Sequence, residues 1–170
     1  MNKNSLKNIA TEVINLEIDA LRILKKSINK SFDKAVNTIV NCQSKIILCG
    51  VGKSGLIAAK IASTLSSVGS PAFSLSANDC LHGDLGSITK KDILILISNS
   101  GKYEEIIPII KFANRNKIKL IGIVSKKNSF LYKGSDIKIL LPEVKESGLG
   151  VVPTSSTSIQ LAIGDALAVA

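Results

Sequence analysis

Three short segments of this chain carry the polar residues that could do chemistry. Glycines, hydroxyls, an amide and a lysine gather directly before helical patterns, in the segments Gly50–Gly55, Ser98–Gly101 and Thr154–Thr157. Backbone N–H groups at the start of a helix attract anions, and neighbouring hydroxyls and amides add further hydrogen-bond donors. The segments together therefore predict a site for a phosphorylated ligand.

The Ser-Asn-Ser-Gly segment, Ser98–Gly101, follows five consecutive apolar residues, Ile93–Ile97. Such a run predicts a strand that is buried on both faces, as in parallel α/β sheets. Ligands of α/β proteins bind at the carboxyl ends of such strands. Glu105 comes four residues after Gly101, and we expect it one turn into the following helix, still close to the ligand.

The segment Gly50–Gly55 has the G-x-G-x-x-G spacing of dinucleotide folds and also contains Gly-Lys-Ser. A P-loop is excluded because its first glycine would have to replace Ile47, inside a predicted strand. A dinucleotide site is disfavoured because no acid stands at the end of the next strand, near Ser76, and Asp79 follows late. Glycines that only tighten a turn are the remaining alternative, but such a turn does not need Lys53, which an anionic ligand would use.

Two further features could serve a ligand. Four consecutive hydroxyl residues, Thr154–Thr157, exceed the one or two that an ordinary helix N-cap needs. The single histidine, His82, stands in the segment His82–Gly86 beside a glycine, which disfavours a core position. A surface histidine is one interpretation; the other is a residue that handles a proton or binds a sugar hydroxyl.

Composition narrows the possible functions. The 170 residues are 45% hydrophobic, enough for one sizeable α/β domain. The net charge of +9 comes almost entirely from scattered lysines, and aromatic residues make up only 4%, so a nucleic-acid surface is not favoured. We interpret the charge as a solvated surface that also attracts anionic substrates.

Three cysteines, Cys42, Cys49 and Cys80, show neither metal spacing nor a disulfide pattern, so we expect no metal site.

The sequence predicts a cytoplasmic protein. Its apolar runs are too short to cross a bilayer, and the polar start, Met1–Ser5, lacks the apolar core of a signal peptide.

Alternating patterns predict the α/β class, with a mostly parallel sheet between helices. Amphipathic helices are expected up to about residue 40, and their apolar stripe could cover the sheet or form an oligomer interface. Strands are expected over 45–49, 72–76, 92–97, 119–124 and 136–141, and helices over 54–68, 103–114 and 155–170, with a helical turn at 129–132. The last helical pattern has no stop signal, so we expect the chain to be a fragment of a longer protein.

Together these motifs resemble the sugar isomerase (SIS) domain family, in particular its arabinose-5-phosphate isomerases of lipopolysaccharide (Kdo) biosynthesis. Five motifs match in order and at the family spacing, over nearly the whole chain: Gly50–Gly55, His82–Gly86, Ile97–Gly101, Pro153–Thr157 and Gly164–Ala168.

The resemblance implies a single SIS domain over residues 1–170, with N-terminal helices over residues 1–40. It implies a five-stranded parallel sheet flanked by helices, a flavodoxin/Rossmann-like three-layer sandwich. It also implies a homo-oligomer, a tetramer with sites between subunits, and no nucleic-acid or membrane partner. Many members carry a C-terminal pair of CBS-type regulatory modules, which we expect to be absent from this chain.

The activity that the resemblance implies is an aldose–ketose isomerisation between D-arabinose 5-phosphate and D-ribulose 5-phosphate. A base removes the proton from C2, an enediolate forms, and the proton returns at C1. The oxygen that becomes negative needs stabilisation, and the phosphate fixes the sugar through remote binding energy. We expect no cofactor, because the reaction consumes none.

The resemblance also assigns site residues. Lys53 would steady negative charge, His82 would contact the sugar, and either Glu105 or Glu146 would be the base, with Glu146 favoured. Substrate binding is assigned to Gly52, Ser54, Ser98, Asn99, Ser100, Gly101, Thr154, Ser155, Ser156 and Thr157.

Some positions depart from the family pattern. Lys102 and Tyr103 replace a glutamate and a small hydroxyl residue, and the segment Lys145–Gly150 is one residue short and lacks a Cys-Pro. A second family histidine falls beyond Ala170, so we expect this chain to bind sugar phosphate but to turn it over weakly.

Two alternative functions remain: an isomerase of hexulose or heptulose phosphates, and a non-catalytic sugar-phosphate sensor. A sensor would not need Lys53, His82 and both glutamates.

Overall fold

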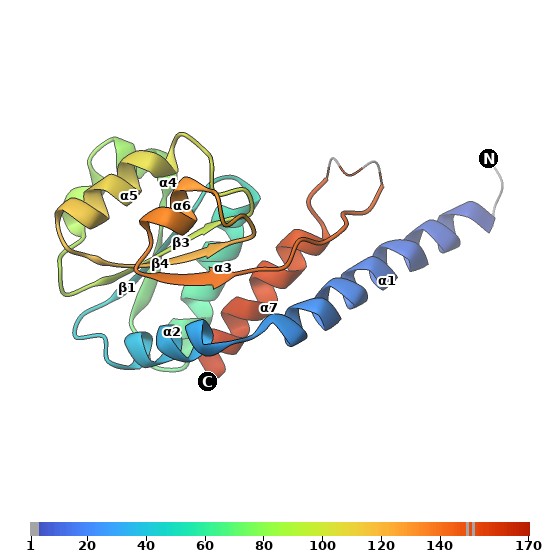
Figure 1. The fold of residues 1–170 in the computed structure, drawn as a ribbon, viewed down its shortest axis with the longest axis horizontal. Coiled ribbons are helices and arrows are strands. Elements are labelled where there is room, and N and C mark those ends of the chain that lie inside the picture. The colour runs from blue at the N-terminus through green and yellow to red at the C-terminus, as the bar shows by residue number, and fades with distance from the viewer. Residues whose placement is uncertain (1–3, 149, 151) are drawn as a thin grey trace.

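The sheet of this protein is five-stranded and entirely parallel, as predicted. A computed structural model describes residues 4–148, 150 and 152–170. The strands lie in the order β2-β1-β3-β4-β5 (Figure 1). Their bounds are β1 Ile46–Gly50, β2 Ala72–Ser76, β3 Ile93–Ser98, β4 Lys119–Val124 and β5 Ile137–Leu140.

Helices cover both faces of the sheet and complete a three-layer sandwich (Figure 1). One face packs against α1, α2, α3 and α7, and the other against α4, α5 and α6. The helices are α1 Asn4–Ser27, α2 Lys30–Val40, α3 Lys53–Ser67, α4 Ala77–Leu81, α5 Ile106–Arg115, α6 Phe130–Gly134 and α7 Ser155–Val169, with a 3₁₀ helix, η1, at Asp84–Ser87.

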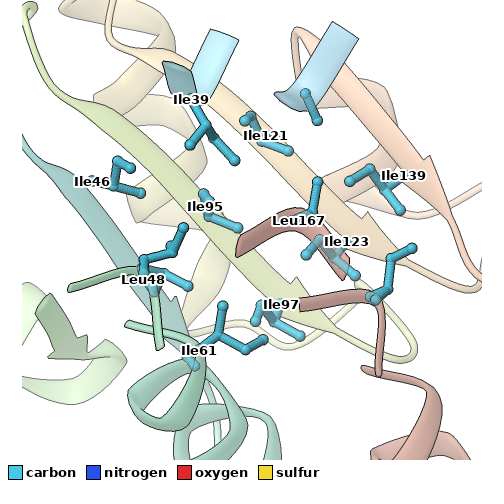
Figure 2. Close-up of a cluster of buried hydrophobic side chains, with 14 of the residues drawn as sticks. Ile39, Ile46, Leu48, Ile61, Ile95, Ile97, Ile121, Ile123, Ile139 and Leu167 are labelled. Atoms are coloured by element: carbon cyan, nitrogen blue, oxygen red, sulfur yellow. The ribbon is translucent and has the colours of Figure 1, made fainter. Parts of the chain in front are cut away.

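The central strands are buried on both faces, which explains their unbroken apolar runs. Successive side chains alternate between the two layers of helices, so that Ile95 and Ile97 join one cluster while Leu94 and Leu96 join the other. Figure 2 shows the first cluster, where Ile39 of α2 and Leu167 of α7 pack over the sheet. Within the described residues, no helix has the length and apolar character needed to span a membrane.

The strand order places a crevice between β1 and β3. The chain leaves β1 toward β2 on one side and then returns to β3 on the other, and both strands run parallel with Gly50 beside Ile97. Open α/β sheets bind ligands at such a switch point, outside the carboxyl ends of the strands. The segments that follow β1 and β3 are therefore neighbours in space.

The structure differs from the prediction around α5 and before β3. Helix α5 begins at Ile106 rather than Tyr103. The backbone hydrogen bonds at its start, from Ile106 N–H to Tyr103 O and from Ile107 N–H to Glu104 O, span three residues and not the four of an α-helix. Glu105 therefore lies at the N-cap and not one turn into the helix. The short elements α4 and η1 were not predicted, because a single turn shows no periodic pattern.

A buried carboxylate, Asp92, joins the amino ends of β1 and β3. It accepts hydrogen bonds from Thr89 N–H at 2.6 Å and from Lys45 Nζ at 3.0 Å, and it is only 1% exposed. Burial raises its pKa, but hydrogen bonds from the side chain of Ser44, from Thr89 and from Lys45 outweigh that effect and lower the pKa to about 2.

We expect Asp92→Asn to destabilise the fold at neutral pH by about 2 kcal/mol, the value of a pKa lowered from its ordinary 3.8 to about 2. Since the folded pKa is the lower one, this stabilisation is complete above about pH 4 and is lost as the pH falls toward 2. Urea unfolding at pH 2 to 7 measures the free energy of unfolding of the wild type and of Asp92→Asn. Parallel pH profiles for the two chains would contradict this role of Asp92.

Candidate functional site

A cleft of about 410 Å³ opens at the carboxyl edge of the sheet. It is bounded by the turn after β1, the loop after β3 and the beginning of α7, which come from three distant parts of the sequence. Its lining consists of Val51, Gly52, Lys53, Ser54, Asn99, Ser100, Tyr103, Glu146, Gly150, Pro153, Ser156, Thr157 and Gln160. Eight of the fourteen predicted site residues are in this set.

The glycine-rich turn brings the start of α3 to the cleft. A Cβ at Gly50 would lie 2.8 Å from the backbone of Ser54, and a Cβ at Gly55 would lie 2.8 Å from the carbonyl oxygen of Gly50. These glycines allow strand and helix to meet closely, whereas Lys53 and Ser54 face the cleft. Gly52 occupies the N-cap with φ of 58° and has no side chain to cap the helix, so the positive end of α3 remains open to a ligand.

The loop after β3 is held by its own side chains. Ser98 is 1% exposed, and its Oγ accepts a hydrogen bond from Gly101 N–H at 3.0 Å. Asn99 Oδ1 accepts one from the Ser125 hydroxyl at 2.6 Å. Ser98 and Gly101 therefore shape the loop without lining the cleft, while Asn99 and Ser100 line it.

The carboxylate of Glu146 caps the start of α7. Its Oε2 accepts hydrogen bonds from Thr154 N–H at 2.8 Å, from Thr154 Oγ1 at 3.1 Å and from Ser156 N–H at 3.3 Å. Burial raises the pKa of Glu146, but hydrogen bonds from Ser156 and Thr154 together lower it below its ordinary value. Glu146 is thus an ionised carboxylate at neutral pH, fixed in the cleft.

The four hydroxyl residues at the start of α7 have different surroundings. Thr154 binds Glu146 and the Ser147 hydroxyl, at 3.1 and 3.0 Å. Ser156 and Thr157 line the cleft, while Ser155 is fully buried and does not. Because the Glu146 carboxylate already accepts from two N–H groups here, those of Thr154 and Ser156, its negative charge disfavours a ligand anion at this helix start relative to the open start of α3.

Two of the four predicted catalytic residues lie outside the cleft. His82 is exposed and follows the end of α4. Glu105 lines a separate, shallow hollow with Leu81, Lys102, Tyr103 and Glu104. Tyr103 borders both the hollow and the cleft, so Glu105 lies next to the cleft rather than in it.

Sequence reasoning missed one buried cleft residue, Gln160. It is 1% exposed, and its Oε1 accepts a hydrogen bond from the Ser54 hydroxyl at 3.1 Å. The available signal was a lone amide between apolar neighbours, Ile159 and Leu161, four residues after Ser156 on the same face of the helix. In the described part of the chain, no three His, Cys, Asp or Glu side chains group as metal ligands would.

The chain is similar in sequence and fold to known proteins. A family model described as SIS domain matches residues 39–170. A protein of E. coli CFT073, c3406, solved in complex with arabinose 5-phosphate, superposes with a TM-score of 0.94 at 34% identity and covers 99% of this chain and 90% of its own.

Curated relatives match over nearly the whole chain. Arabinose 5-phosphate isomerase KdsD of Yersinia pestis is 42% identical over 160 residues, which are 94% of this chain and 49% of the relative. An uncharacterised protein of Rickettsia prowazekii is 40% identical over 167 residues, 98% of this chain and 52% of the relative. The chain therefore spans about half the length of these relatives.

Proposed function

This chain belongs to the SIS domain family, and from that membership we propose that it acts as a sugar-phosphate isomerase. The proposed reaction interconverts D-arabinose 5-phosphate and D-ribulose 5-phosphate and supplies Kdo and lipopolysaccharide biosynthesis in the cytoplasm. The name of the Yersinia relative and the arabinose 5-phosphate bound in the E. coli structure support this substrate.

One observation carries the proposal: an ionised carboxylate and an open helix start share one cleft. Glu146 is fixed by the N–H groups of α7, while the start of α3 lacks a side-chain cap and carries Lys53. A phosphorylated sugar needs a positive anchor at one end, and an isomerase also needs a base near C2. The cleft supplies both kinds of group.

The proposed chemistry follows from this arrangement. The phosphate binds at the start of α3, with Lys53, Asn99 and Ser100 around it, because Glu146 repels it from the start of α7. Glu146 takes the proton from C2 of the open-chain aldose, and the C2–H electron pair moves into the enediolate as the C1 carbonyl oxygen becomes negative. The proton on Glu146 exchanges with solvent, and Glu146 then delivers a proton to C1. The C2 hydroxyl proton passes to the C1 oxygen as C2 becomes the carbonyl, so no electrons leave the sugar.

His82 and Glu105 need a different explanation, because they are predicted site residues that do not line the cleft. Neither lines the cleft of its own chain: Glu105 lies in the adjacent hollow, and His82 is exposed after α4. In a tetramer with sites between subunits, as the family resemblance implies, residues at the rim of one cleft contribute to the neighbouring one. We propose that His82 contacts the sugar in this way.

An exposed apolar stripe supports self-association. Helix α1 extends away from the sandwich (Figure 1), and large apolar side chains along it are 39% to 66% exposed: Leu6, Ile9, Ile14, Ile18, Leu21 and Ile23. Of these, Ile14, Ile18 and Leu21 share one face of the helix, and an exposed apolar face of this kind marks an interaction surface. We expect sedimentation equilibrium to find a homo-oligomer, and we expect Ile14→Glu with Ile18→Glu to shift it toward monomer. A monomeric wild-type chain would contradict this assignment.

The proposed function is tested by incubating the chain with D-ribulose 5-phosphate and following the sugar carbons by ¹³C NMR. Arabinose 5-phosphate should appear, and in D₂O deuterium should enter at the exchanging carbon. Parallel incubations with a hexulose 6-phosphate and sedoheptulose 7-phosphate measure selectivity. Turnover of one of these instead would reassign the substrate, and binding of all without any exchange would indicate a sensor.

A further inference from the structure

Gln160 stands out in the cleft because it is a buried amide. Among the described residues it is the one asparagine or glutamine side chain that is buried. It lies in the second turn of α7, and it lines the cleft although it belongs to none of the three motif segments. A buried amide has two donors and an acceptor to satisfy, so its neighbours determine its role.

Helix packing fixes the contact between Gln160 and Ser54. One turn after Gln160, a Cβ at Gly164 would lie 2.2 Å from Ile61 Cδ1 of α3. The missing side chain therefore lets α7 approach α3 closely, and the two helix starts meet at the cleft. The Ser54–Gln160 hydrogen bond, at 3.1 Å, lies across this junction.

The direction of this hydrogen bond matters for ligand binding. The Ser54 hydroxyl donates its single proton to Gln160 Oε1, so Ser54 presents only lone pairs to the cleft. A phosphate oxygen is itself an acceptor and gains nothing from such a partner. Ser54 can bind phosphate only if its proton is released from Gln160.

An amide can release that proton without losing the bond. When the amide turns by half a rotation, its Nε2 faces Ser54 Oγ and donates to it. The hydroxyl proton of Ser54 is then free to point at the ligand. Glutamine can act in both directions, whereas a glutamate at this position would only accept and an apolar residue would do neither.

We propose that Gln160 is a positioning residue for Ser54. When the Gln160 amide turns, the Ser54 hydroxyl stops donating to Gln160 and donates to the ligand phosphate instead. The inference rests on the proposed function, because it assumes that a phosphorylated ligand occupies the cleft. It adds a residue that acts through Ser54 and does not itself need to touch the ligand.

Calorimetric titration with inorganic phosphate and with ribulose 5-phosphate tests the switch. Gln160→Met keeps the size of the side chain but removes the Nε2 donor that orients the Ser54 hydroxyl toward the ligand. We therefore expect it to weaken the binding of both ligands about tenfold. Gln160→Glu should weaken them further, because it holds the Ser54 proton and adds a negative charge. Ser158→Ala, on the same helix but outside the cleft lining, is the matched control and should leave affinity unchanged.

A double-mutant cycle identifies the route of the effect. If Gln160 acts through Ser54, then Ser54→Ala with Gln160→Met should bind no more weakly than Ser54→Ala alone. In the Gln160 variants that turn over substrate, KM should rise while kcat changes less than twofold. A general loss of folded structure would not produce that pattern. Thermal unfolding of Gln160→Met shows that the fold persists.

The outcomes separate this inference from the proposed function. Additive losses in the cycle, or wild-type affinity in Gln160→Glu, would overturn the switch while leaving the isomerase proposal intact. A wild-type chain that binds neither phosphate nor ribulose 5-phosphate would remove the proposed function, and the switch with it.

Discussion

Glu146→Gln is expected to slow the isomerisation by about 10²- to 10⁴-fold, the range for removing a positioned base, while the chain still binds ribulose 5-phosphate. The amide cannot take the C2 proton. It retains an oxygen that accepts the hydrogen bonds now made to Glu146 Oε2 by Thr154 and Ser156. Loss of rate without loss of affinity is therefore the expected signature.

Deuterium exchange at the sugar carbons in D₂O measures this prediction directly, because it reports the proton transfer even when net turnover is slow. Glu143→Gln is the matched control: Glu143 lies three residues earlier, pairs with Lys126 at 2.7 Å, and is largely exposed outside the cleft. Its exchange rate should equal that of the wild type.

Glu105→Gln distinguishes the two candidate bases. Because Glu105 lines the adjacent hollow and not the cleft, we expect it to slow exchange less than Glu146→Gln does. The reverse ranking would transfer the role of base to Glu105 and would mean that the ligand approaches from the hollow.

The fold could be predicted from the sequence because its signals are local. The run Ile93–Ile97 can hardly be anything but a buried strand, and the same holds for the strand before Gly50. Since the carboxyl ends of parallel strands lie at one edge, the segments after them were predicted to meet, and they do.

The roles of individual side chains depend on packing that no local pattern contains. Ser98 and Ser100 look equivalent in the sequence, yet one turns inward to Gly101 N–H while the other lines the cleft. The same is true of Ser155 and Ser156. Glu146 stands in an irregular segment, and its hydrogen bonds to α7 follow only from the three-dimensional structure.

Lys53→Met is expected to weaken binding of ribulose 5-phosphate by about ten- to a hundredfold, the loss of one hydrogen bond to a charged group. Among the described residues that line the cleft, Lys53 is the one with a positive charge. It also stands at the first position of α3, where the helix start carries no side-chain cap. Calorimetric titration measures the loss.

The salt dependence of binding distinguishes a local contact from the general positive field of the chain. Wild-type affinity should fall as the salt concentration rises, and Lys53→Met should flatten that dependence. Lys102→Met removes the same charge from the adjacent hollow and should cause a much smaller loss, while Lys53→Arg should recover part of the affinity. Equal losses for Lys53→Met and Lys102→Met would mean that the net charge of +9, and not the start of α3, collects the phosphate.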